Sequence, residues 1–220
     1  MAQKRQLYIL VSQTQTGIGR MIRRVCRYPY NHVSVTLDPS LRRWYSFARY
    51  VHDVPLYGGL VSESPARLCY PDGDILVRAY RVEIPKQRAA RLEGLLSLAD
   101  DTGSDLIYNH FDAMASVFGR RLELPRCYTC LSFACEILGR RYMTIGELCR
   151  DLEPQLFFEG PLSRLVTIPE ADGEEPYFIP GGLVSGTARS TGQLGKLAVR
   201  TIYQGCRASL EYLLRRTAHE

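Results

Sequence analysis

One of the seven cysteines, Cys130, has a sequence context that favours a reactive thiol. Pro125 lies shortly upstream, Thr129 is a good N-cap residue, and residues 131–138 have the apolar pattern of a short helix. The unpaired amides and the dipole at the start of a helix stabilise a thiolate, and the same amides can donate to an oxyanion. Cys130 is therefore a candidate nucleophile, although a small buried cysteine gives the same local pattern.

A thiol nucleophile needs a rigidly held base, and histidine is the usual residue for this task. Of the four histidines, His32 alone opens a strong strand, in the run Tyr-Asn-His-Val-Ser at 30–34. Residues 32–37 alternate with period two and are rich in β-branched types, which predicts a strand that fixes the imidazole. Since a lone histidine on a strand is more often structural, the residue types alone leave both interpretations open.

The spacing Cys127-x-x-Cys130 also fits two other kinds of site. A zinc site needs a second pair of ligands, and only Cys135 follows at short distance. A thioredoxin-like redox pair needs a βαβ setting, which the pattern of elements lacks. We therefore expect neither a metal nor a cofactor.

Length and composition indicate an ordinary globular chain. It has 220 residues, 45% of them apolar, and a net charge of +5, which suits one domain with an appendage. The charge excess is mild and no basic block is interleaved with aromatic residues, so nucleic-acid binding is not expected. The apolar run at 7–11 is too short for a signal peptide or a membrane span, and the odd cysteine count disfavours a disulfide framework. These features predict reduced thiols and a cytoplasmic location.

Hydrophobic periodicity predicts both strands and helices, without regular βαβ units, and so favours an α+β fold. Strands are expected at 7–12, 32–37, 43–48 and 74–82, and helices at 18–26, 85–99, 108–118, 129–138, 144–150 and 194–216. Residues 54–66 are expected to form a loop because they contain two adjacent glycines and two prolines. Residues 159–192 are expected to form a long loop with a short strand at 177–179.

The final helix has an apolar stripe on one side. The stripe comprises Val199, Ile202, Tyr203, Cys206, Leu210, Leu213 and Leu214. Because it contains neither Trp nor Phe, it favours docking on the domain or pairing with a second copy of the chain over lying on a membrane surface.

Two sequence blocks, in this order, resemble a known family. They are Tyr-Asn-His-Val-Ser at 30–34 and Tyr-Thr-Cys-x-x-Phe at 128–133. Over about residues 6–155 the chain resembles permuted NlpC-like cysteine hydrolases, of the YiiX type, and more distantly the lecithin:retinol acyltransferase group. The resemblance implies a circularly permuted papain-like fold in which an antiparallel sheet packs on helices. It implies a catalytic domain at 1–155, with 156–220 as a loop and C-terminal helix appendage.

The resemblance also implies roles for single residues. Cys130 would be the nucleophile and His32 the general base, and a polar residue on the next strand would orient the imidazole. Residues 43–48 contain no Asp, Glu, Asn or His, which leaves Ser46 as the nearest candidate, with Glu63 or Asp38 as alternatives from loops. A tyrosine often completes the oxyanion site in this family. Tyr108 is the candidate, and a purely packing role fits it equally well.

The expected activity is cleavage of an amide or ester through a thioester intermediate, with a peptide, an amide or a lipid ester as the acyl substrate. One alternative is a lipid acyltransferase or lipid-ester hydrolase at a membrane, which would involve peripheral membrane contact. Another is a catalytically inactive binding module, favoured by the absence of a clear third residue. The C-terminal helix is also a candidate surface for a homo-oligomer.

Overall fold

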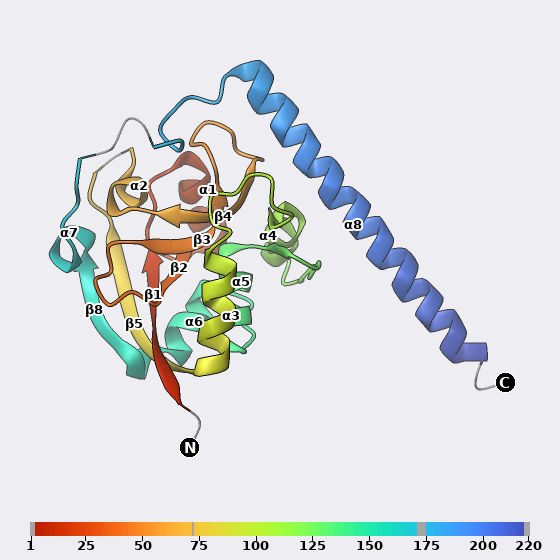
Figure 1. Ribbon diagram of the computed structural model, residues 1–220, viewed down its shortest axis with the longest axis horizontal. Helices are drawn as coiled ribbons and strands as arrows, with labels where there is room; N and C mark the ends of the chain where they lie inside the picture. The colour runs from red at the N-terminus through yellow and green to blue at the C-terminus, as the bar shows by residue number, and fades with distance from the viewer. Residues whose placement is uncertain (1–2, 72, 171–174, 218–220) are drawn as a thin grey trace.

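The computed structural model describes residues 3–71, 73–170 and 175–217, and these contain one large sheet with helices on both faces (Figure 1). The strand order is β7-β6-β4-β3-β2-β1-β5-β8, and all neighbours are antiparallel except β6 and β7. The strands are β1 (Lys4–Ser12), β2 (His32–Thr36), β3 (Trp44–Arg49), β4 (Gly58–Glu63), β5 (Leu76–Pro85), β6 (Ile107–Tyr108), β7 (Cys127–Tyr128) and β8 (Leu156–Pro161). The chain is an α+β protein, as its sequence predicts.

The central strand β1 is buried on both faces, and its alternating side chains supply two hydrophobic cores. Leu7 and Ile9 face one core, and Tyr8 and Leu10 face the other. The first core includes residues of α3 (Lys86–Leu96), α5 (Cys130–Leu138) and α6 (Ile145–Asp151). The second includes residues of α2 (Pro65–Cys69) and α7 (Leu162–Leu165). The sheet is thus covered on both sides, and α5 lies on the same side as α3.

The loop predicted at 54–66 is wrong, because most of this segment forms β4 and α2. The two glycines belong to the strand. A Cβ atom on Gly58 would lie 2.5 Å from the carbonyl oxygen of Ala48, and one on Gly59 would lie 2.1 Å from the hydroxyl of Tyr50. Glycine is therefore required here by close approach of neighbouring backbone and side chains, rather than by a turn. Glu63, the last residue of β4, is held in a regular ladder opposite Trp44.

The long loop predicted at 159–192 is also wrong in its first and last parts. Strand β8 pairs with β5 and α7 follows it, so the sheet continues past the boundary expected at residue 155. Residues 177–179 form a turn rather than a strand, and 171–174 lie outside the described residues. The last helix, α8 (Leu183–Thr217), begins eleven residues earlier than the pattern predicts.

The remaining helices connect the strands around the edge of the sheet. They are α1 (Gly17–Cys26), α4 (His110–Val117) and the 3-10 turn η1 (Glu153–Gln155). Tyr108, expected at the start of a helix, lies instead on β6, because Asn109 caps α4 by accepting a hydrogen bond from the Asp112 amide at 3.0 Å. Among the described residues, no helix combines the length and the apolarity that crossing a bilayer requires.

Candidate active site

Cys130 is the first residue of α5, and the start of this helix is defined by a capping box. The Ser132 amide donates to the Thr129 hydroxyl at 3.1 Å, and the Thr129 amide donates to the Ser132 hydroxyl at 2.7 Å. The first regular helical bond runs from the Phe133 amide to the Thr129 carbonyl at 3.0 Å. The amides of Cys130 and Leu131 precede that bond, so this end of α5 has the partial positive charge that favours an anion.

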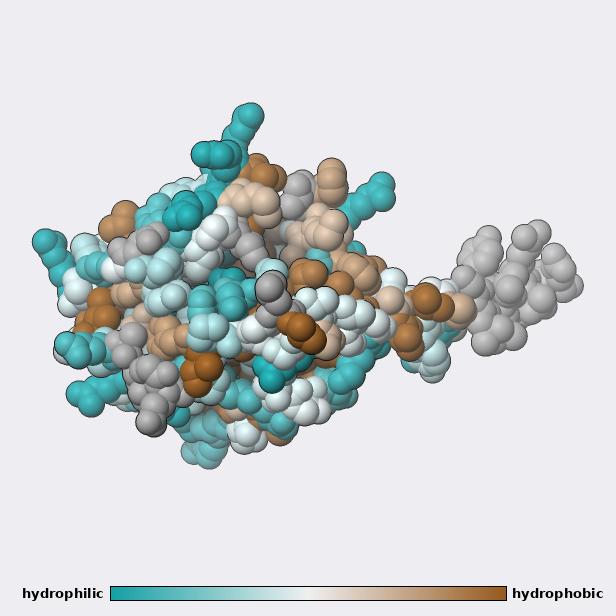
Figure 2. All heavy atoms as spheres, turned by 90° about the horizontal axis from the view of Figure 1, so that it is seen from above, coloured by the Kyte–Doolittle hydropathy of each residue, from teal (hydrophilic) through white to brown (hydrophobic). Residues whose placement is uncertain are grey.

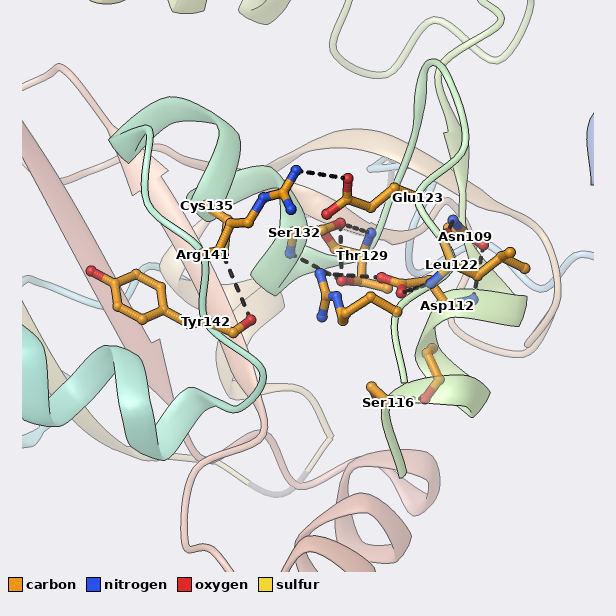
Figure 3. A network of polar contacts seen from close by, with 12 residues as sticks. Asn109, Asp112, Ser116, Leu122, Glu123, Thr129, Ser132, Cys135, Arg141 and Tyr142 are labelled. Atoms are coloured by element: carbon orange, nitrogen blue, oxygen red, sulfur yellow. Dashed lines mark hydrogen bonds and ion pairs between the residues drawn. The ribbon is translucent and has the colours of Figure 1, made fainter. Parts of the chain in front are cut away.

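A polar network behind α5 fixes the segments that lead to the cysteine (Figure 3). The Asn109 side-chain amide donates to the Leu122 carbonyl at 2.7 Å, and the Leu122 amide donates to the buried Asp112 carboxylate at 2.8 Å. The Asn109 amide also donates to the Tyr128 carbonyl at 2.9 Å. These bonds tie the end of β6 to the residue pair just before the Thr129 cap, and they hold the start of α5 in place.

His32 is the first residue of β2, and its imidazole lies between the cysteine and a carboxylate. Its Nε2 lies 2.9 Å and 3.0 Å from the two Glu63 carboxylate oxygens, and 3.2 Å from the Ser46 hydroxyl. The Cys130 side chain also shares a hydrogen bond with the imidazole and accepts one from the Val33 amide. Because Nε2 is occupied by Glu63, Nδ1 is the ring nitrogen left for the sulfur. The two residues predicted as nucleophile and base therefore meet in the fold.

The buried charges around His32 stabilise one another. Burial alone would lower the pKa of His32, but the Glu63 charge and the hydrogen bond to Cys130 outweigh it and raise the pKa to about 10. Burial alone would raise the pKa of Glu63, but the His32 charge, the His32 hydrogen bond and nearby Arg67 lower it to about 2. At neutral pH this carboxylate is ionised and the imidazole is protonated.

The same partners activate the cysteine. Burial would raise the pKa of the Cys130 thiol, but the hydrogen bond and charge of His32, together with the Val33 amide, lower it below its ordinary value. By contrast, burial raises the pKa values of the Cys127 and Cys135 thiols. Among these three neighbouring cysteines, Cys130 alone has an environment that favours the thiolate.

The residue that orients His32 differs from the one expected: it is Glu63 rather than Ser46. Ser46 lies on β3 and does contact His32, but Glu63 contacts the same nitrogen at shorter distance and carries the charge. Glu63 reaches the imidazole from the end of β4, not from a loop, and its carboxylate also accepts a hydrogen bond from the Ser34 hydroxyl at 2.6 Å. Asp38, the other alternative, bonds to Ser40 in an exposed turn.

A cleft of about 360 Å³ opens beside the cysteine, and Tyr108 lines it together with Cys130 and His32. The pKa of the Tyr108 phenol is raised above its ordinary range by burial and then by the nearby Cys130 charge, so the two groups are close neighbours. The His110 ring lies against Tyr108 in a tilted arrangement with centroids 4.7 Å apart, and burial lowers the pKa of His110 to about 4. His110 is therefore neutral at pH 7. It cannot substitute for His32 as the charged partner of the thiolate.

Arg67 is a further site residue, and it is not among those expected from the sequence. It is buried on α2, and its guanidinium donates to the carbonyls of Ser62 and Arg49 at 3.1 Å and 2.6 Å. It also stacks on Tyr177 at 4.2 Å from the ring centroid. Its positive charge helps to keep Glu63 ionised. In the sequence, Arg67 comes four residues after Glu63. This spacing is only a weak sign that the two lie close together, because it depends on the helical turn of α2 between them.

No family model, no curated protein and no solved structure matches this chain. Its class is therefore defined by the fold and the site. It is an α+β protein in which Cys130, His32 and Glu63 form one buried hydrogen-bonded chain beside a cleft. Within the described part of the chain, no group of three or more His, Cys, Asp or Glu side chains is arranged to hold a metal ion.

Proposed function

We propose that the protein is a cysteine hydrolase that cleaves an amide or ester through a thioester on Cys130. One observation carries the proposal: the partly buried Cys130 thiol is hydrogen-bonded to His32, which lowers its pKa although burial acts in the opposite direction. Activated thiols of this kind are typical of nucleophilic catalysis. Structural cysteines in apolar surroundings, such as Cys127 and Cys135 here, have raised pKa values.

The reaction follows from the resting ion pair. The Cys130 thiolate attacks the acyl carbon, and the carbonyl electron pair moves to oxygen, where the first amides of α5, with Tyr108 beside them, can stabilise it. Protonated His32 then gives its proton to the leaving amine or alcohol as the bond to the acyl carbon breaks, and a thioester remains. Water loses a proton to the now neutral His32 and attacks the thioester, and Cys130 leaves as the thiolate. Throughout the cycle, Glu63 stabilises the imidazolium and fixes the ring orientation.

The permuted papain-like arrangement is part of the proposal. Its support is the order of the two site elements: the histidine strand β2 precedes the cysteine helix α5, and α5 packs against the antiparallel sheet. In this arrangement the imidazole uses one nitrogen for the sulfur and the other for an orienting carboxylate. This is supported by the His32 contacts: Nε2 faces the Glu63 carboxylate, and the ring also shares a hydrogen bond with Cys130.

The cleft favours a substrate with an apolar group next to the scissile bond. Its lining includes Met21, Leu56 and Met114, whose side chains are exposed although they are large and apolar. Ile22 and Phe47 line the same cleft. Exposed apolar side chains around a concave site are typical of binding surfaces for apolar ligands. We therefore favour an acyl chain or an apolar amide over a strongly polar substrate.

An inactive binding module is the second candidate function. The sequence supports it through the lack of an Asp, Glu, Asn or His on residues 43–48, since an unoriented histidine makes a poor base. The contact of Glu63 with His32 at 2.9 Å removes that support, because a carboxylate occupies the orienting position from the neighbouring strand. The module is therefore the less favoured of the two.

The test uses p-nitrophenyl esters of increasing acyl length, with mass spectrometry of the quenched protein. We expect a burst of nitrophenol and an acyl group on the peptide that contains Cys130. Longer acyl chains should react faster than acetate. Cys130→Ala should abolish both signals, and Cys135→Ala, a cysteine on the same helix, should keep them. An acyl group on other cysteines only, or a burst that survives Cys130→Ala, would refute the proposal.

A further inference from the structure

The C-terminal helix α8 has two faces with different roles, and only one of them packs on the body. Gln193, Leu197 and Arg200 form the docking face. The Gln193 side chain accepts from the Gly58 amide and donates to the Gly58 carbonyl, both at 2.8 Å, and Arg200 donates to the Asp105 carbonyl at 2.9 Å. Leu197 is fully buried in a cluster with β6 and β7 residues. This face is held firmly to the domain.

The apolar stripe predicted from the sequence is not the docking face. Val199, Ile202 and Tyr203 are each about two-thirds exposed, at 66%, 66% and 68%, and Cys206 is exposed as well. At about 100° per residue, Ile202 points about 140° away from Leu197 around the helix axis. The stripe therefore faces away from the body, and the expectation that it docks on the domain is wrong. The side chains of Leu210, Leu213 and Leu214 lie outside the described part.

The second half of α8 extends clear of the domain (Figure 1), and hydrophobic side chains lie on it where it leaves the body (Figure 2). In proteins, most of the stability of a helix comes from packing of its apolar face. An exposed apolar stripe on a projecting helix therefore indicates a surface that a partner covers.

The charge of the helix identifies the partner. Residues 183–217 contain six Arg or Lys and one Glu, a net charge of +5. The whole chain also has a net charge of +5, so the 22 basic and 22 acidic residues outside α8 cancel. At the same angular step, Lys196 lies beside the stripe, about 20° from Tyr203. A second copy of α8 would bring +5 against +5, whereas an anionic lipid surface attracts this net positive charge.

We propose that α8 is a membrane-docking surface: its stripe at Val199, Ile202, Tyr203 and Cys206 inserts into the interfacial region of an anionic bilayer, and Lys196 beside the stripe contacts the headgroups. This is the behaviour of an amphipathic helix that lies in the interface without spanning it. The docking face at Leu197 stays on the domain, so the whole protein is held at the lipid surface. The surface is independent of the chemistry at Cys130.

The full chain is tested by co-sedimentation with vesicles of phosphatidylcholine alone or of phosphatidylcholine with phosphatidylserine. We expect binding to the anionic vesicles, weakened at least fivefold by salt raised from about 0.1 M to about 0.5 M. The triple variant Val199→Ser, Ile202→Ser, Tyr203→Ser should lose at least fivefold in binding, and Lys196→Glu should weaken it too. Leu76→Ser, which removes an exposed apolar side chain from β5, is the matched control and should bind normally.

Sedimentation equilibrium of the same samples separates the alternatives. A dimer that the triple variant dissociates, with no vesicle binding, would replace the lipid surface by a second copy and overturn the proposal. A monomer that binds neither vesicle, or binding that the triple variant retains, would overturn it as well. Equal circular dichroism and thermal midpoints for wild type and variants show that the fold is kept, which is expected because the altered side chains are exposed.

Discussion

Replacing Glu63 by glutamine removes the charge that holds His32 protonated and keeps the shape of the side chain. The glutamine carbonyl can still accept a hydrogen bond from His32 Nε2, which lies 2.9 Å from a Glu63 oxygen in the wild type. The change therefore isolates the electrostatic contribution of the carboxylate. Because the imidazole then becomes less basic, its proton returns to the Cys130 sulfur, and the thiolate fraction at neutral pH falls.

The expected size follows from the geometry. Two unit charges about 4 Å apart interact by about 4 kcal/mol at an effective dielectric constant of about 20. At about 1.4 kcal/mol for each pKa unit, this corresponds to about 3 units. The pKa of His32 is raised from 6.5 to about 10, which is of the same size. Since a released thiol has a pKa of about 8.5, we expect the thiolate fraction at pH 7 to decrease by about 30-fold.

The assay is the pH dependence of Cys130 alkylation by iodoacetamide, followed peptide by peptide with mass spectrometry. Wild type should reach half-maximal reactivity well below the ordinary thiol range, and Glu63→Gln should move that point upward towards about 8.5. Ser46→Ala is the matched control, because it removes a neutral contact to the same nitrogen at 3.2 Å and should change the rate by less than about tenfold. Identical profiles for wild type and Glu63→Gln, or a larger effect from Ser46→Ala, would refute the reasoning.

Two further predictions concern stability. Phe133→Ala should lower the unfolding free energy by about 3–5 kcal/mol in a urea titration, because the Phe133 ring is fully buried, with its centroid 5.2 Å from that of the Phe47 ring. The control is Phe118→Ala, which should change the unfolding free energy by less than about 0.5 kcal/mol because Phe118 is 79% exposed. The folded pKa of Glu63 is about 2 against 4.5 in the unfolded chain, so its ionisation stabilises the protein above pH 4.5 and this contribution is lost as the pH falls towards 2. The difference in unfolding free energy between wild type and Glu63→Gln should therefore become smaller as the pH falls from 4.5 to 2. A difference that stays constant would contradict the assigned pKa of Glu63.

The strands and helices with clean periodicity could be predicted from the sequence. Residues 32–37 and 129–138 alternate or repeat as their elements require, and the structure has β2 and α5 there. The failures occur where local residue types and tertiary contacts disagree. The pair Gly58-Gly59 is typical of a turn, but it lies in β4 because Ala48 and Tyr50 leave no room for a Cβ atom. A Cβ atom on Gly59 would also approach the Leu106 carbonyl, which is distant in sequence. No local sequence pattern therefore reveals this crowding.

The same reason limits what the sequence says about the third site residue. The sequence favours Ser46 because it lies on the strand that follows the histidine strand, and its hydroxyl does reach His32. Glu63 reaches the same nitrogen only because β4 pairs with β3 in the register that puts Ser46 opposite Val61. Without that register, Glu63 is one carboxylate in a glycine-rich stretch. The charge that controls the imidazole is therefore set by strand pairing, which the sequence does not reveal locally.

The three cysteines around the start of α5 show that residue type alone does not determine thiol reactivity. Cys127 and Cys135 are at least as buried as Cys130, and for both of them burial raises the thiol pKa. Cys127 even has an Arg200 nitrogen 3.0 Å from its sulfur, yet the desolvation still dominates. What distinguishes Cys130 is a partner that is itself kept charged: His32 can hold a proton inside the protein because the ionised Glu63 carboxylate contacts it. Activation of the thiol is thus a property of the chain from Cys130 through His32 to Glu63, and loss of the Glu63 charge should be felt at the sulfur through the pKa of His32.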